Sequence, residues 1–156
     1  MGAIEDKIKA MGLALPEPFK FPKPNRTGCV VVGSIVYMSG HGRVSTPGVK
    51  AKGKLGRELT VEDGYATARA VALAMLASLK QQVGDLDRVK RVIRLYGMVN
   101  VAPGFDRMPE VIDGASDFFY ELFGPQAGQH ARTAVGLAEL PHGIPIEING
   151  EFELKT

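Results

Sequence analysis

Two charged side chains interrupt the apolar pattern near the C-terminal end of the chain. Arg132 stands in the run from His130 to Leu137, and Glu147 interrupts the run from Ile144 to Ile148. An arginine can hold a carboxylate through two parallel hydrogen bonds, and a glutamate can orient or deprotonate a water molecule. If the two runs pair as a hairpin, both side chains lie opposite each other near its open end. The plainer alternative is an ion pair across an exposed sheet face.

Other residues that could do chemistry form weaker motifs. The segment 48–54 has the spacing of a phosphate-binding loop up to its lysine, but Leu55 stands where Ser or Thr should bind magnesium. We interpret this segment as a lysine-rich surface loop. The three histidines, His41, His130 and His142, are dispersed and show no metal-binding spacing, so no metal site is expected.

Composition excludes several classes of protein. The chain has 156 residues, enough for one domain, and its single cysteine, Cys29, excludes an internal disulfide. We expect Cys29 to be a small buried side chain, and no cofactor is expected. A formal charge of +2 and the absence of Trp argue against a nucleic-acid partner. No apolar run reaches the ~20 residues that span a bilayer, and the N-terminus lacks a signal-peptide pattern, so we expect no membrane contact and a cytoplasmic location.

Apolar patterning predicts an α+β protein in the order β-β-(β)-α-β-α-β-β. Gly33 and Ser34 separate two β-branched runs, as in a tight hairpin. Thr60 and Asp63 resemble a capping box at the start of the clearest helix, which ends at Gly84. Strands are expected at 29–32, 35–38, briefly within 43–58, at 89–101, 131–138 and 144–154, and helices from 60 to 83 and from about 109 to 123.

The first 27 residues look like an N-terminal arm attached to a domain at 28–156. Ile4, Ile8 and Met11 have helical spacing and predict a short helix. Four prolines between positions 15 and 24 then require an extended segment, because each ring removes a backbone donor.

Two helices can cover only one face of the predicted sheet. The other face keeps apolar residues in several strands, and the chain supplies no further element to cover them. We therefore expect another copy of the same chain to do so.

Several phrases in this order resemble one family. They are Ser39-Gly40 after the second strand and the run ARTAVGLAELPHGIPIEI from Ala131 to Ile148. From about residue 28 to residue 154 the chain resembles the Rid family, the reactive-intermediate deaminases also called YjgF or endoribonuclease L-PSP. The resemblance implies a chorismate-mutase-like fold, a mixed sheet with two helices on one face. It also implies a homotrimer with a central barrel and ligand clefts between neighbouring subunits.

The resemblance also implies roles for individual residues. Arg132 matches the arginine that holds the carboxylate of a 2-imino acid, and Glu147 matches the glutamate that places the attacking water. Gly40 matches a backbone position at the cleft, with Ser39 beside it, and Thr133 is expected to line the same cleft.

This chain departs from the family pattern at several positions. Deaminating members commonly have a tyrosine where this chain has Pro24-Asn25-Arg26, and a cysteine where it has Ala134. An asparagine on the second helix is most nearly replaced by Asp113, which would repel a carboxylate substrate. His41 could act as an acid, a base or a hydrogen-bond donor; a turn histidine making one structural bond is the alternative.

The leading hypothesis is therefore a homotrimeric deaminase that needs no cofactor and hydrolyses 2-imino acids or enamines to 2-oxo acids and ammonia. The alternative is a trimer that binds a small anionic metabolite without turnover. A ribonuclease is a third hypothesis, and near-neutral charge weighs against it.

Overall fold

The computed structural model describes residues 2–156 and confirms the α+β class, a mixed sheet with helices on one face. Thr60 and Asp63 form the expected capping box, and Gly84 ends the same helix at a φ of 84°. In chain order the elements are α1 (Ala3–Ala10), β1 (Cys29–Val32), β2 (Ile35–His41), α2 (Val61–Val83), the 3₁₀ turn η1 (Leu86–Arg88), β3 (Val89–Asn100), α3 (Met108–Ala127), β4 (Ala131–Leu137), the 3₁₀ turn η2 (Pro141–Gly143) and β5 (Ile146–Leu154).

The five strands are ordered β1-β2-β5-β3-β4, and only the β3–β4 pair is parallel. The expected hairpin between the last two strands is wrong, because β3 lies between β4 and β5. α3 connects β3 to β4 as a crossover, which delivers β4 parallel to β3 on one side. β5 then pairs with the free side of β3, so the turn at η2 joins strands that are not neighbours.

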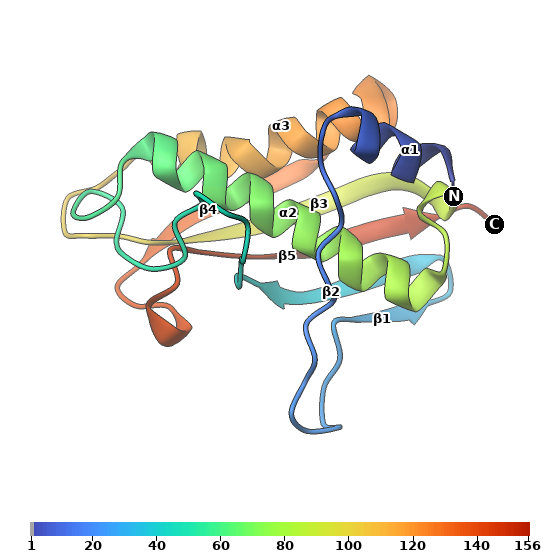
Figure 1. The fold of residues 1–156 in the computed structure, drawn as a ribbon, viewed down its shortest axis with the longest axis horizontal. Helices are drawn as coiled ribbons and strands as arrows, with labels where there is room; N and C mark the ends of the chain where they lie inside the picture. The colour runs from blue at the N-terminus through green and yellow to red at the C-terminus, as the bar shows by residue number, and fades with distance from the viewer. Residues whose placement is uncertain (1) are drawn as a thin grey trace.

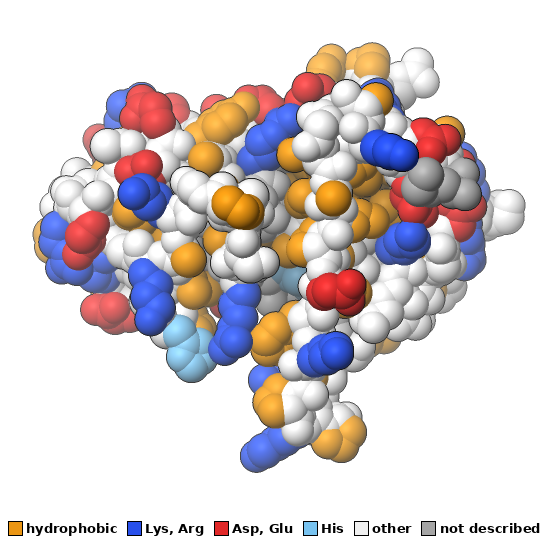
Figure 2. Space-filling view, in the orientation of Figure 1, with side chains coloured by type: hydrophobic (Ala, Val, Ile, Leu, Met, Phe, Trp, Pro, Cys, Tyr) orange, Lys and Arg blue, Asp and Glu red, His pale blue; other side chains and the backbone are white. Residues whose placement is uncertain are grey.

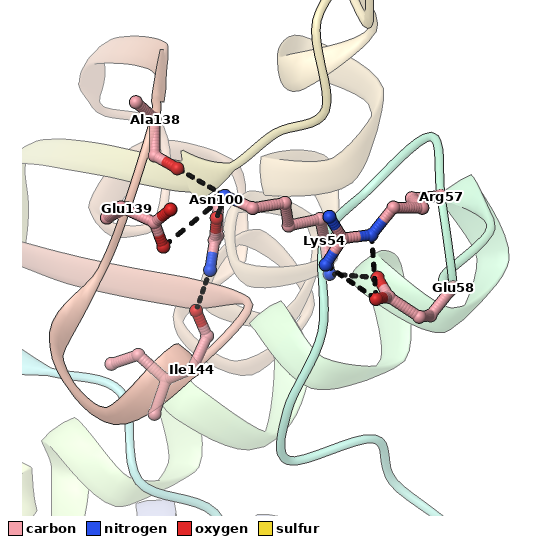
Figure 3. Close-up of polar contacts among 7 residues, drawn as sticks. All are labelled: Lys54, Arg57, Glu58, Asn100, Ala138, Glu139 and Ile144. Carbon is pink, nitrogen blue, oxygen red and sulfur yellow. Dashed lines mark hydrogen bonds and ion pairs between the residues drawn. The ribbon is translucent and has the colours of Figure 1, made fainter.

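The expected short strand within 43–58 is also wrong. Leu55 makes only isolated bridges, to Leu59 and to Val101. A lysine holds this loop instead: the Lys54 ammonium donates to the Asn100 side chain at 2.7 Å and to the carbonyl of Ala138 (Figure 3). The lysine of the phosphate-loop-like segment is thus occupied by structural contacts.

Helices α2 and α3 lie side by side over one face of the sheet, and the core fills the space between the two layers (Figure 1). Phe118 and Phe119 of α3 and Phe152 of β5 are fully buried there. In the described part of the chain, no helix is long and apolar enough to cross a membrane.

The N-terminal arm begins with a well-anchored helix. The Asp87 carboxylate accepts hydrogen bonds from the backbone amides of Ala3 and Ile4, both at 2.8 Å, and these bonds lower the pKa of Asp87. Ile8 is buried against the core. Beyond α1 the arm crosses over α2, and its tip projects past the edge of the sheet before β1 begins (Figure 1).

Candidate functional site

Glu147 is a carboxylate without a partner inside a pocket. It lies on β5 between the buried residues Ile146 and Ile148, so alternation points its side chain away from the helices. Burial raises the pKa of Glu147 above its usual value. Among residues 2–156 no hydrogen bond or ion pair to this carboxylate is found. A half-buried carboxylate of raised pKa that is free to take a proton is suited to general acid–base chemistry.

Gly40 brings the end of β2 directly against Glu147. A Cβ atom at this position would lie 2.8 Å from Oε2 of Glu147, so only glycine leaves the carboxylate where it is. The pairing of β2 with β5 is irregular between Met38 and His41, and Gly40, which lines the pocket, lies in this irregular stretch, whereas Ser39 does not line the pocket. The Ser39 hydroxyl itself donates to the carbonyl of Thr27.

His41 lines the same pocket, but both of its ring nitrogens are engaged. Nδ1 lies 2.6 Å from the carbonyl of Ser39 and therefore donates, and Nε2 lies 2.8 Å from Oγ of Ser78. Burial lowers the pKa of His41, so the ring is neutral at pH 7 and Nε2 accepts from the serine hydroxyl. The bond to Ser78 holds the end of β2 to α2, and the bond to Ser39 fixes the ring within β2.

Arg132 lies elsewhere in the chain, against α3. One terminal guanidinium nitrogen donates to Oδ1 of Asp113 at 2.6 Å and to Oγ of Ser116 at 3.2 Å. The Asp113 side chain is 46% exposed and that of Arg132 is 22% exposed, so the pair sits at the surface. The arginine is accessible to a ligand, but an acidic neighbour already compensates its charge.

His130 completes the support of Arg132. Its Nδ1 donates to the carbonyl of Gly128 at 2.6 Å, and its Nε2 lies 2.9 Å from Oγ of Ser116. Burial lowers the pKa of His130, so Nε2 accepts the serine proton and leaves the serine oxygen free to accept from Arg132. The guanidinium orientation thus depends on a neutral histidine.

The two residues proposed for catalysis do not meet within one chain. Arg132 lies beside Leu95 on β3, and Leu95 lies beside Gly150 on β5, so Glu147 is two strands away and three residues further along. Ideal strand spacing puts their Cα atoms roughly 14 Å apart. Arg132 also leaves the sheet toward α3, whereas Glu147 leaves on the opposite face. Thr133, next to Arg132, is exposed.

The pocket around Glu147 has a volume of about 580 Å³ and contains residues that the sequence did not single out. The N-terminal arm supplies Phe19, Phe21 and Arg26, and the loop after β2 supplies Arg43. The Arg43 guanidinium lies 4.9 Å from the Phe19 ring centre, which links loop and arm. The signal in the sequence was the pair Phe19 and Phe21 between prolines, since two large apolar side chains are unusual in a solvent-exposed linker.

No metal site emerges from this arrangement. Within residues 2–156, no three side chains of His, Cys, Asp and Glu come together as a metal ion requires. Cys29 is buried, and burial raises the pKa of its thiol to about 11, which keeps it protonated at neutral pH.

Comparison with known proteins identifies the family to which this fold belongs. The family model described as "YjgF/chorismate mutase-like, putative endoribonuclease" matches residues 5–142. The chain belongs to this family. The match begins inside α1, so the YjgF family model includes most of the N-terminal arm.

Several known proteins are similar to nearly the whole chain. Protein TCP17 of Trypanosoma cruzi is 39% identical over 155 residues, 99% of this chain and 96% of that protein. A solved structure from Shewanella oneidensis, also named a "putative endoribonuclease", is 34% identical with a TM-score of 0.90, covering 98% of this chain and 100% of that one. The protein Atu1372 of Agrobacterium tumefaciens, of unknown function, is 33% identical with a TM-score of 0.88, covering 97% of this chain and 92% of that one.

A more distant structure has the same fold. Escherichia coli TdcF, solved with bound serine, is 20% identical with a TM-score of 0.51, covering 92% of this chain and 96% of that one. At this identity the likeness shows the fold alone.

Proposed function

We propose that this protein hydrolyses reactive 2-imino acids or their enamines to 2-oxo acids and ammonia. The observation that carries the proposal is the Glu147 carboxylate, half-buried, without a partner and pressed against the Gly40 backbone in a pocket. Membership of the YjgF family is consistent with it. TdcF, which shares the fold, binds serine, a small molecule with a carboxylate.

The proposed site requires two copies of the chain. Arg132 and Glu147 lie on opposite faces of one sheet, so a single small molecule can touch both only if they come from different subunits. β4, which bears Arg132, is an edge strand and can approach a neighbour. The sheet face without helices exposes large apolar side chains that a neighbour would cover: Val30 (51% exposed), Val32 (60%) and Tyr37 (49%). We propose a homotrimer with its ligand clefts between subunits.

In the proposed reaction Arg132 of one copy binds the substrate carboxylate and Glu147 of the next positions a water molecule. The water oxygen attacks the imine carbon, its proton passes to the Glu147 carboxylate, and the C=N electron pair moves to nitrogen. Glu147 then returns the proton to nitrogen. The nitrogen then takes a second proton from solvent, and the C–N bond breaks as the hydroxyl group loses its proton to solvent, which yields the 2-oxo acid and ammonia. Because imines hydrolyse spontaneously, orientation of water and substrate supplies the acceleration.

A dehydratase that releases 2-iminopropionate provides the test. We expect pyruvate to appear faster with this protein than in buffer. Glu147→Gln should abolish the acceleration, and Glu62→Gln, an exposed glutamate at the start of α2, should leave it intact. Equal rates with and without the protein, in a sample shown to be trimeric, would refute the proposal.

A second candidate is a trimer that binds a small carboxylate without turnover. Two departures from the deaminase pattern favour it: this chain has Pro24-Asn25-Arg26 where deaminating members commonly have a tyrosine, and Ala134 where they commonly have a cysteine. In that case a 2-oxo acid should raise the melting temperature, Arg132→Ala should remove the effect, and no imine should be consumed faster than in buffer.

Ribonuclease activity is suggested by the names of the family and of the Shewanella relative. The formal charge of +2 gives little attraction for a polyanion, and both nitrogens of His41 and of His130 are engaged in structural bonds. RNA cleavage that persists unchanged in Arg132→Ala and Glu147→Gln would identify a contaminant.

A further inference from the structure

The Glu147 pocket is larger and more apolar than a three-carbon imino acid needs. Its volume of about 580 Å³ lies in the range of sites that enclose much larger ligands. Apolar side chains line the pocket from four segments of the chain: the arm, the loop after β2, helix α2 and the loop before β5. Their members are Pro16, Phe19, Phe21, Val44, Ala70, Ala74, Pro141 and Ile144.

The side of the pocket that helix α2 forms consists of small residues. Ala70 and Ala74 lie four positions apart on one helix face and are partly exposed to the pocket, while their neighbours Val71 and Met75 are fully buried in the core. The arm crosses above this face (Figure 1). Two alanines under a crossing segment leave a space that any longer side chain would fill.

The arm forms the opposite wall through aromatic rings. Phe19 and Phe21 pack edge to face with ring centres 4.9 Å apart, and both line the pocket. Figure 2 shows hydrophobic side chains beside the arm and basic side chains at its projecting tip. Edge-to-face geometry is the arrangement in which a further aromatic ring also packs well.

Polar residues also line the pocket, and they include Glu17 and Arg26 on the arm. Glu147 and the Gly40 backbone lie on β5 and at the end of β2, and Arg43 lies on the following loop against Phe19. In the described residues 2–156, Arg43 makes no ion pair with a carboxylate. A ligand that fits has a polar end beside Glu147 and Arg43 and an apolar body that lies between α2 and the arm.

We propose that this pocket is a side-chain subsite for 2-imino acids with a large apolar, preferably aromatic, side chain. Phe19 and Ala74 determine its specificity. The inference rests on the proposed function, because it assumes that the reacting end of the substrate lies at Glu147. It adds a preference that neither Arg132 nor Glu147 determines.

Binding of the stable 2-oxo acid products tests the subsite without any assay of turnover. Phenylpyruvate should bind the full-length protein at least tenfold more tightly than pyruvate in titration calorimetry. Ala74→Leu should weaken phenylpyruvate binding at least tenfold and change pyruvate binding less than twofold. Ala66→Leu, an exposed alanine on the same helix outside the pocket, is the matched control and should change neither.

Phe19→Ala is a second variant that removes the wall without filling the space. It should weaken phenylpyruvate binding about fivefold and leave pyruvate binding and the melting temperature unchanged, since Phe19 is 37% exposed. Equal affinity for the two acids, or an Ala74→Leu protein that binds phenylpyruvate as tightly as wild type, would overturn the subsite. If the preference holds and no imine is hydrolysed, the subsite stands and the proposed catalytic function fails.

Discussion

Asp113 is expected to compete with any carboxylate that binds Arg132. Its Oδ1 lies 2.6 Å from the guanidinium nitrogen, so a second carboxylate on the same guanidinium would lie about 4 Å from the first. Two unit charges at that distance repel by about 1 kcal/mol in water and by more in a drier site. Because Asp113 is 46% exposed, solvent screening makes the lower figure appropriate.

Asp113→Asn removes this repulsion and keeps a side chain that can accept from Arg132. We expect affinity for a 2-oxo acid to rise roughly fivefold, since about 1.4 kcal/mol corresponds to tenfold. Titration calorimetry at low salt measures the gain, and about 0.5 M salt should reduce it. The result also bears on function, because an enzyme held back by Asp113 should gain kcat/KM by a similar factor.

Asp117→Asn is the matched control. Asp117 lies one helical turn further along α3 and accepts from the Tyr65 hydroxyl at 2.6 Å, with no bond to Arg132. The two variants change net charge equally, so an equal gain in both would indicate a general charge effect. An Asp113→Asn protein that binds no better than wild type would refute the idea that Asp113 opposes the ligand.

Three further predictions concern single side chains. Lys54→Met leaves the buried Asn100 oxygen without its donor and should lower the free energy of unfolding by about 2 kcal/mol, measured by urea titration. The control, Lys52→Met on the exposed loop, should change that free energy by under about 0.5 kcal/mol. Gly40→Ala should displace the Glu147 carboxylate and reduce turnover at least tenfold at a cost of under about 1 kcal/mol in stability, because the flexible end of a side chain gives way. Glu147→Gln should raise the free energy of unfolding at pH 7, where burial penalises the ionised carboxylate of the wild type. This difference between variant and wild type should shrink as the pH falls through the raised pKa of Glu147. It should vanish below pH 4.5, where Glu147 is protonated in both the folded and the unfolded wild type. A stability difference that grows toward acid pH would contradict the last prediction.

Local sequence signals predicted most of the fold. The capping box of Thr60 and Asp63, the glycine stop at Gly84 and the β-branched runs around Gly33 each act over a few residues and appear in the structure as expected. Strand order depends on long-range packing that periodicity does not encode. The β4–β5 hairpin failed for this reason, since β3 satisfies the backbone groups of both strands.

The sequence indicated individual residues of the candidate site better than it indicated which of them lie together. Gly40 and Glu147 were selected from the sequence and lie in contact. Arg132 was selected with them, and the structure instead places it with Asp113 on the other side of the sheet. Phe19 and Arg43 were missed, because their approach depends on how a proline-rich segment folds back over α2, and no short-range rule predicts that path.

The way the arm is attached separates the shape of the ligand pocket from the stability of the fold, two properties that usually constrain each other. At its start Asp87 holds α1, and at its end Thr27 and Gly28 bond to Ser39. Within the described chain, no hydrogen bond ties residues 14–26 to the body between these anchors. Leu15 packs against the core, but substitutions at the exposed Phe19 can reshape the pocket wall with little effect on folding free energy. A lineage could therefore change its ligand through this one segment and leave the sheet, the helices and Glu147 as they are.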